Sequence, residues 1–179
     1  PGAKFPKMEQ VLGYFKQADK LLQANDFESQ EDFDTFLQNV FSEVDGMETR
    51  MSCHHDGSQF LERIIGHASD FQVRVFYDKI TAEMAKLATH RYASHVVESL
   101  LKRSGKLMLL KVPSEEHEGL ASLPEMILRL SGEIGEAFES VLCNSWGSHV
   151  YRRMIEVLAT FPAEFAKELE TILENVSMS

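Results

Sequence analysis

Two segments of the chain share a distinctive helix opening, "HRYASHVVESLL" at residues 90–101 and "NSWGSHVYRRMI" at residues 144–155. In each, an aromatic residue and a small residue precede Ser-His-Val, and apolar residues follow at helical spacing. A third segment, "HHDGSQFLERII" at residues 54–65, superposes on both in the same register. The chain therefore repeats one structural unit, and its fold must accommodate three copies of it.

The spacing of the copies indicates the kind of repeat. Ser58 and Ser94 are 36 residues apart, whereas Ser94 and Ser148 are 54 apart, an excess of 18. The excess matches an insertion at about 102–125, which is rich in Gly, Pro and charge and which we expect to be a loop or partly disordered. A helical period in the middle thirties is typical of an α-solenoid, in which each repeat covers its apolar face with its neighbours.

Apolar residues recur at helical spacing along nearly the whole chain, so we expect an all-α fold. The best candidate for a strand, residues 71–77, is short and lies between helical patterns. We expect residues 1–50 to form an N-terminal helical cap with the first helix of repeat one, and residues 51–160 to contain the three repeats. Residues 161–179 form an acidic amphipathic pattern that would start or cap a further repeat.

Several classes of protein are disfavoured by the sequence. No apolar run approaches the roughly 18 residues of a membrane span, and no secretory signal pattern opens the chain. Cys53 and Cys143 form no CxxC pair, which favours a reducing compartment. The cluster "SCHHD" at 52–56 has no second group of metal ligands at a recognised spacing. The sequence also contains no GxGxxG or GxxxxGK[ST] motif for nucleotide binding and no GxSxG motif for a catalytic serine. We therefore expect no metal, no cofactor and no enzymatic activity.

The first residue is Pro rather than Met, which suggests a fragment.

The formal net charge of −10 weighs against nucleic-acid binding, because a basic face normally neutralises the phosphates. The acidic residues are unevenly distributed, however, and many of them lie in residues 25–34, 114–118 and 163–174. The repeated helices and their flanks instead carry a group of cations: Arg91, Lys102, Arg103, Lys106, Arg152 and Arg153. Two interpretations stay open, an RNA-binding array and an acidic helical-repeat scaffold that binds protein partners.

Each copy places three polar side chains on one side of its helix, because residues four apart lie one turn above each other. These sets are Ser58, Gln59 and Glu62; Ser94, His95 and Glu98; and Ser148, His149 and Arg152. A planar group beside a hydroxyl and a charged group could stack on one unstacked base and meet its Watson–Crick edge. A carboxylate suits the two N–H donors of guanine, and a guanidinium suits the acceptors of cytosine.

Ordinary structural roles explain the same residues. Serine often caps helices, and surface histidines often only pack. The carboxylate of Glu98 lies four residues before Lys102, and Arg152 lies four before Glu156, so each could form an intrahelical ion pair. The recurrence of the sets in three copies favours the binding interpretation.

The segment "HRYASHVVESLL" resembles the second helix of a pumilio (PUF) repeat. The order of "LGYFKQADKLL", "FLQNVFSEVDG", "LATHRYASHVVESLL", an insertion and "WGSHVYRRMIEVL" resembles a divergent nucleolar branch of that family, over about residues 10–160. The resemblance implies an α-solenoid in the nucleolus that binds single-stranded precursor ribosomal RNA during small-subunit assembly, without cutting it and with assembly factors as possible partners. The family has many more repeats than three.

The resemblance also implies residue roles. The base-edge positions of the family fall on Ser58, Glu62, Ser94, Glu98, Ser148 and Arg152, and its stacking positions fall on Gln59, His95 and His149. Because RNA runs antiparallel to the repeats in that family, these residues predict the triplet 5′-C-G-G-3′. We further expect Lys102, Arg103 and Arg153 to reach phosphates. Glutamine stacks less well than the Tyr, His or Arg usual in the family.

Overall fold

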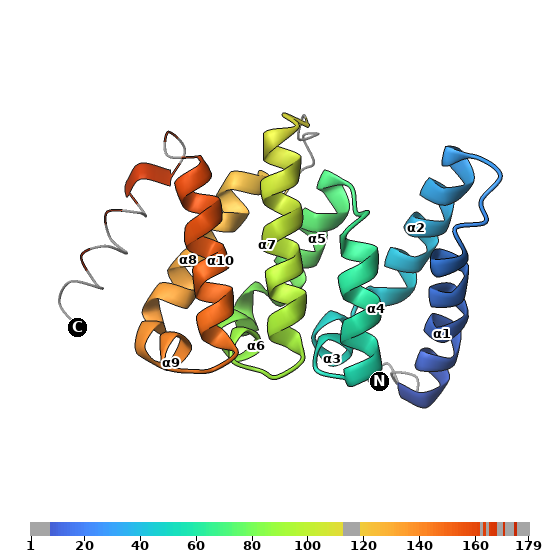
Figure 1. The fold of residues 1–179 in the computed structure, drawn as a ribbon, viewed down its shortest axis with the longest axis horizontal. Helices are drawn as coiled ribbons and strands as arrows, with labels where there is room; N and C mark the ends of the chain where they lie inside the picture. Colours follow the sequence, from blue (N-terminus) through green and yellow to red (C-terminus); the bar gives the residue numbers. More distant parts are fainter. Residues whose placement is uncertain are drawn as a thin grey trace.

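The computed structural model describes residues 8–112 and 119–161, together with residues 163, 165–167, 170 and 174. These residues form helices and connections with no strand, which confirms the all-α prediction (Figure 1). The helices are α1 (Met8–Ala24), α2 (Gln30–Val44), α3 (Glu48–Ser52), α4 (His55–Ile65), α5 (Asp70–Ile80), the 3₁₀ turn η1 (Thr81–Glu83), α6 (Met84–Ala88), α7 (Ala93–Leu109), α8 (Leu123–Glu136), α9 (Phe138–Leu142) and α10 (Gly147–Thr160). Within the described ranges, no helix has the length and apolar character to cross a membrane.

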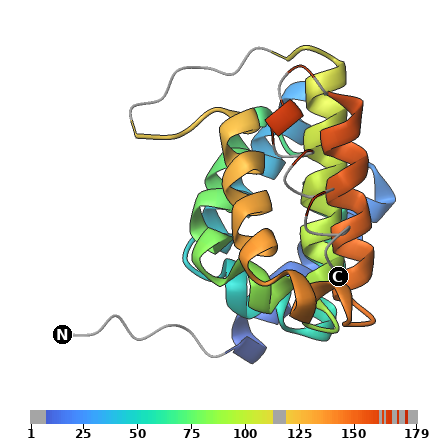
Figure 2. The same cartoon turned by 90° about the vertical axis from the view of Figure 1, so that its left-hand side faces the viewer.

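The three copies of the repeated opening begin α4, α7 and α10, and these helices stand side by side in one row. We call these three helices the repeat row; α1 packs on α4 and extends it at the N-terminal end (Figure 1). Helices α5 and α8 form a second layer behind the row (Figure 2). Two-layer stacking of this kind is the α-solenoid arrangement expected from the period.

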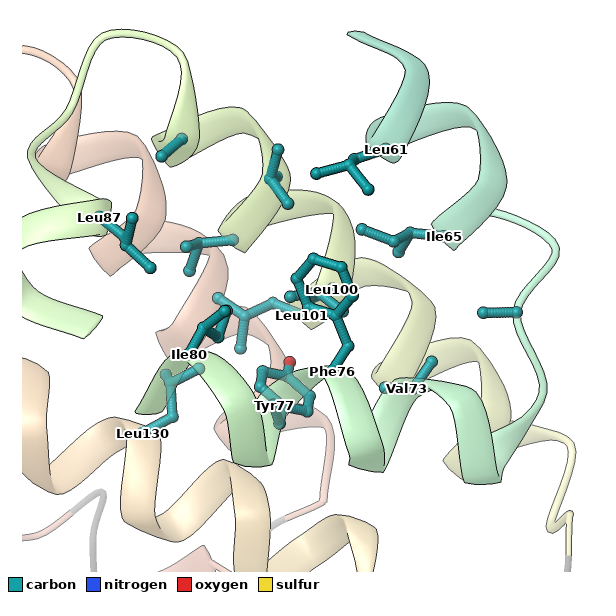
Figure 3. Close-up of a cluster of buried hydrophobic side chains, with 14 of the residues drawn as sticks. Leu61, Ile65, Val73, Phe76, Tyr77, Ile80, Leu87, Leu100, Leu101 and Leu130 are labelled. Carbon is teal, nitrogen blue, oxygen red and sulfur yellow. The ribbon is translucent and has the colours of Figure 1, made fainter. Parts of the chain in front are cut away.

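The core lies between the two layers, with α7 at its centre (Figure 3). Leu61 of α4, Leu100 of α7 and Leu130 of α8 are all fully buried there. Each such side chain contributes roughly 2 kcal/mol of burial free energy. Side chains from three successive repeats meet in this cluster. A single repeat could therefore not bury its apolar face without its neighbours.

Each row helix begins with the same kind of side-chain cap. A ring or amide group three residues before the small residue of the motif accepts a hydrogen bond from the backbone N–H of that small residue. The pairs are His54 with Gly57 at 3.4 Å, His90 with Ala93 at 3.2 Å and Asn144 with Gly147 at 2.9 Å. The first turns of the three helices are therefore fixed by equivalent contacts.

Close backbone approach explains the small residue after the cap. A Cβ atom on Gly57 would lie only 2.6 Å from the carbonyl oxygen of Met51, and one on Gly147 would clash with the carbonyl oxygen of Val141. In both repeats, the row helix thus touches the short helix that precedes it, α3 or α9. The second repeat accommodates a buried Ala93 at the same position.

The interruption between repeats two and three is shorter than we expected. Helix α7 continues to Leu109 and α8 begins at Leu123, so helix covers both ends of the predicted insertion at 102–125. Residues 113–118 lie outside the described part. The acidic helix predicted at 161–179 also lies mostly outside it, and the division into repeats stays a prediction.

A buried ion pair that the sequence did not reveal fixes the chain before α8. Arg74 and Asp70 of α5 are 1% and 6% exposed, and their charged groups lie 2.8 Å apart. The Arg74 guanidinium also donates to the carbonyl oxygen of Ala121 at 3.1 Å. The segment that returns from the interruption is thereby joined to the core.

We predict opposite effects of alanine at two glycines. Gly147→Ala should lower the free energy of unfolding by about 1–3 kcal/mol, because the added Cβ collides with backbone. The matched control Gly132→Ala, in open space within α8, should raise it by about 0.5–1 kcal/mol. Thermal or denaturant unfolding measures both, and a neutral Gly147→Ala would contradict the close approach.

Candidate nucleic-acid interface

The three predicted stacking residues occupy the same turn of the three row helices. Gln59, His95 and His149 each follow the motif serine by one position, and all three side chains are exposed. Their helices are neighbours in the row, so one planar polar group per repeat reaches solvent at the same level of each helix. One exposed planar group per repeat is a feature that stacking on consecutive unstacked bases would use.

The aromatic residue of the motif contacts the preceding repeat. The ring of Tyr92 meets His55 edge-to-face at 5.3 Å, and the ring of Trp146 meets His95 at 6.2 Å. Such contacts orient the imidazole of His95 while leaving it exposed. Tyr92 and Trp146 thus pack one repeat against the previous one. Their rings and the histidines that they contact form a polar and aromatic surface along the row.

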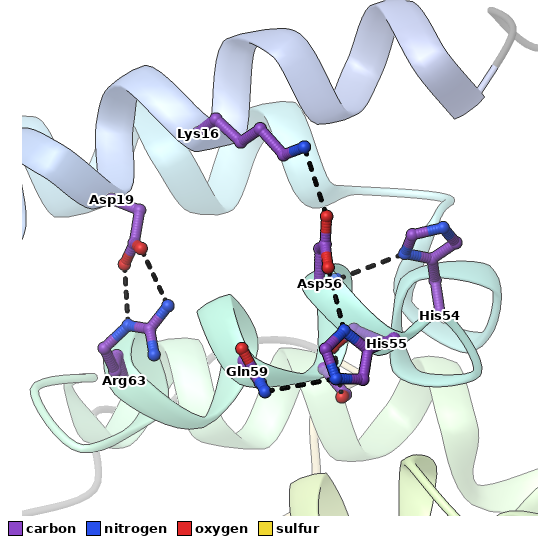
Figure 4. A network of polar contacts seen from close by, with 9 residues as sticks. Lys16, Asp19, His54, His55, Asp56, Gln59 and Arg63 are labelled. Carbon is purple, nitrogen blue, oxygen red and sulfur yellow. Dashed lines mark hydrogen bonds and ion pairs between the residues drawn. The ribbon is translucent and has the colours of Figure 1, made fainter.

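Repeat one departs from this pattern because Asp56 replaces the aromatic residue. Its carboxylate lies 3.2 Å from the ammonium of Lys16 on α1 and 2.8 Å from Nδ1 of His55 (Figure 4). The side-chain hydrogen bond with His55, followed by that with Lys16, lowers the pKa of Asp56. An ionic contact with the N-terminal helix therefore takes the place of a ring contact.

The motif serines face the helix turns. Ser58 and Ser94 are only 2% and 3% exposed, and the Ser58 hydroxyl donates to the carbonyl oxygen of His55 at 3.0 Å. The less buried Ser148 donates to the carbonyl oxygen of Ser145 at 3.3 Å. The buried Ser94 hydroxyl has no hydrogen-bond partner among the described residues. The positions of Ser58 and Ser148 thus give these hydroxyls a structural role in the turn, and base contact by the serines stays a prediction.

Glu98 and Arg152 do not form the ion pairs with Lys102 and Glu156 that their spacing along the helix suggested. Glu98 of α7 lies 3.4 Å from Arg153 of α10, and Arg153 also pairs with Glu156. The Arg152 guanidinium instead donates to Nδ1 of His149 at 3.1 Å. Arg153 therefore connects two row helices, whereas Arg152 stays exposed beside a stacking position.

Glu62 of α4 is half-buried, and among the described residues no cation lies within ion-pair distance of it. Burial raises the pKa of its carboxyl, and the nearby negative charge of Glu98 raises it further; His95 and Arg63 act in the opposite direction. Two carboxylates, each predicted to meet a base edge, therefore lie on adjacent helices.

Of the three predicted phosphate contacts, only Lys102 is exposed. Arg103 donates from Nε to the carbonyl oxygen of Ala68 at 2.7 Å, and burial lowers its pKa. It ties α7 to the connection between α4 and α5. Because Arg153 is engaged in the ion pairs above, both arginines have a structural partner, and their contact with phosphates stays a prediction.

Two arginines that sequence reasoning did not assign shape this surface. Arg63 makes a bidentate contact with Asp19 of α1 at 2.6 and 2.7 Å (Figure 4). The guanidinium of Arg91 lies 4.8 Å from the ring centroid of Tyr92. Asp19 and Arg63 are 44 positions apart, so no local spacing pointed to their contact.

The described residues contain no group of three or more His, Cys, Asp and Glu side chains placed to hold a metal ion. Within the cluster at 52–56, His54 caps α4 and His55 pairs with Asp56.

Comparison with known proteins identifies the family. The model of the NOP9-like PUF repeat domain matches residues 46–174. The chain belongs to the NOP9-like PUF repeat family. The resemblance noted in the repeated motif is thus confirmed over most of the chain.

Relatives and solved structures agree with this assignment. Proteins named Nucleolar protein 9 from Komagataella phaffii and Sordaria macrospora are each 32% identical, over 82% and 88% of this chain. The chain spans only 24% and 22% of their lengths. An APUM23 structure matches 93% of this chain and 31% of its own, with a TM-score of 0.78 at 23% identity. The Puf4 RNA-binding domain matches 90% of this chain and 43% of its own, with a TM-score of 0.61 at 13% identity.

The raised pKa of Glu62 predicts a stability effect that depends on pH. Folding disfavours the ionised carboxylate, so the penalty is present above the folded-state pKa and disappears below the unfolded-state pKa. Glu62→Gln should therefore raise the melting temperature at neutral pH and leave it unchanged near about pH 3. The exposed Glu133→Gln corrects for the general loss of one negative charge. An equal effect of the two variants at neutral pH would count against the prediction.

Proposed function

We propose that this chain binds single-stranded RNA along the repeat row, with one nucleotide for each of α4, α7 and α10. The observation that carries the proposal is the exposure of Gln59, His95 and His149 at equivalent positions of neighbouring helices. Stacking on such groups contributes about 1–3 kcal/mol per base and tolerates any base. The charged residues one turn on, Glu62, Glu98 and Arg152, would meet the base edges and add selectivity.

The net charge of −10 does not oppose this proposal, because the repeat-row helices carry their own cations. Arg152 and Lys102 are exposed on α10 and α7. With few phosphate contacts, we expect modest affinity for the chain alone and a shallow dependence on salt. Further repeats of a longer parent protein would increase the affinity by binding the same strand.

The RNA named with a structural neighbour supports the predicted triplet. The strands in the APUM23 structure titles, among them GGAAUUGACGG and GGAGUUGACGG, end as written in CGG. The side chains at the base-edge positions of this chain, together with the strand direction that the pumilio resemblance implies, predict 5′-C-G-G-3′. An antiparallel strand would place the 3′ guanine on α4, the middle guanine on α7 and the cytosine on α10.

The relatives point to a cellular setting. Because several are named Nucleolar protein 9, we propose that the parent protein lies in the nucleolus and binds precursor ribosomal RNA during small-subunit assembly, without catalysis. Ribosome assembly factors are the protein partners that this setting implies.

A second candidate function, protein binding, has its own structural support. A groove of about 970 Å³ lies between α2 and α5 and reaches the C-terminal part of α7, where Arg103 and Leu107 line it. Its lining includes the exposed ring of Phe71, with Asp34 and Asp45 along α2. Such a surface suits a partner chain better than a nucleic acid, and its lining contains none of the predicted stacking residues Gln59, His95 and His149.

The proposed RNA contact predicts the effect of a double substitution. His95→Ala with Glu98→Ala should weaken binding to a single strand containing CGG by about tenfold or more, through loss of one stack and one base-edge contact. The fold should be unchanged in circular dichroism, because His95 is exposed and Glu98 only half-buried.

The matched control is His67→Ala, which removes an exposed imidazole beside the α2–α5 groove. It should leave RNA affinity unchanged. A titration at fixed low salt measures all three proteins. Equal affinities of the wild-type chain and the double variant would reject the proposed interface.

A further inference from the structure

One kind of ion pair recurs between a helix of the repeat row and the helix packed before it. The residue five positions after the motif serine is Arg63 in repeat one and Arg153 in repeat three. Each arginine reaches back to a carboxylate on the preceding helix, Asp19 of α1 at 2.6 Å and Glu98 of α7 at 3.4 Å. We call this contact the back-reaching ion pair. It connects α4 to α1, and α10 to α7.

Repeat two lacks this ion pair because Ser99 stands where the other repeats have arginine. A seryl side chain is too short to reach a carboxylate on the neighbouring helix. The carboxylate that an arginine at position 99 would meet is Glu62 of α4, which occupies the position of Glu98 in its own repeat. Glu62 therefore remains without a cation at ion-pair distance in the described part of the chain, although it is half-buried.

This difference matters for binding a guanine. The Watson–Crick edge of guanine offers two adjacent N–H donors, which a carboxylate accepts best with both of its oxygens. The Oε1 atom of Glu98 is already directed at Nη2 of Arg153, so a base must compete with a cation for it. Among the described residues, Glu62 has no such competitor at ion-pair distance, although His95 and Arg63 lie near enough to lower its pKa. A guanine edge would give its partly desolvated charge two hydrogen-bond donors.

We propose that the back-reaching ion pair determines which repeat selects guanine: Glu62 selects it strongly, whereas Arg153 weakens selection by Glu98. In this proposal Arg153 is a positioning residue that holds the carboxylate of Glu98. The sequence had instead predicted that Arg153 contacts a phosphate. The inference rests on the proposed RNA contact and adds to it a difference between two sites that carry the same acidic residue.

The experiment uses the 179-residue chain and a short uridine-flanked strand containing 5′-CGG-3′, with either guanine replaced by adenine. The wild-type chain should lose about tenfold in affinity when the 3′ guanine, facing Glu62, is replaced. It should lose less than about threefold when the middle guanine, facing Glu98, is replaced. Arg153→Gln should raise the second loss to about tenfold, because Glu98 is then released.

The reciprocal variant adds the missing ion pair. Ser99→Arg should lower the loss at the 3′ guanine to below about threefold, whereas the control Ser99→Ala should leave it at about tenfold. A measurement without RNA tests the contact itself: Glu98→Gln and Arg153→Gln should lower the melting temperature by less together than the sum of their separate effects.

The outcomes separate the inference from the proposed function. If the wild-type chain binds no single strand at low salt, the proposed function fails and this inference fails with it. If it binds, but both guanines matter equally and neither Arg153→Gln nor Ser99→Arg changes their ratio, only the inference is overturned. Additive melting effects of the two substitutions would also overturn it, because the ion pair would then be absent in solution.

Discussion

The contact between the start of each row helix and the short helix before it sets the geometry of the whole array. At Gly57 and Gly147, backbone approaches so closely that no side chain fits. A helix held at its first turn cannot rotate about its own axis, so the side chains that follow point in a fixed direction. The exposure of Gln59, His95 and His149 on one surface is a consequence of this constraint.

The features that repeat along the sequence could be predicted, because a repeated motif repeats its structure. The helical row and the exposure of His95 and His149 follow from the superposition of three copies. The ion pair between Glu98 and Arg153 could not be predicted, because its partners are 55 positions apart on different helices. The contact of Arg103 with the carbonyl oxygen of Ala68 could not be predicted either, because a backbone carbonyl belongs to no particular residue type.

The same surface shows how the cations of an acidic chain can be used within the fold. Arginines that a charge count would assign to phosphates serve instead to join one helix to the next, as Arg63 and Arg153 do. The carboxylates that they meet lie at or beside the base-edge positions. The cohesion of the row and the base selectivity that we propose therefore involve the same few side chains, and a substitution that changes one should be examined for its effect on the other.

The buried contact of Arg74 with Asp70 and Ala121 has a consequence for how such a protein can diverge. This contact joins the residues just before α8 to α5, and α8 itself packs on α5 and α6. Connections of different lengths cost little extra entropy to close, since that cost grows only logarithmically with length. We therefore expect related chains to differ in length between α7 and α8 while the neighbouring repeats keep their alignment.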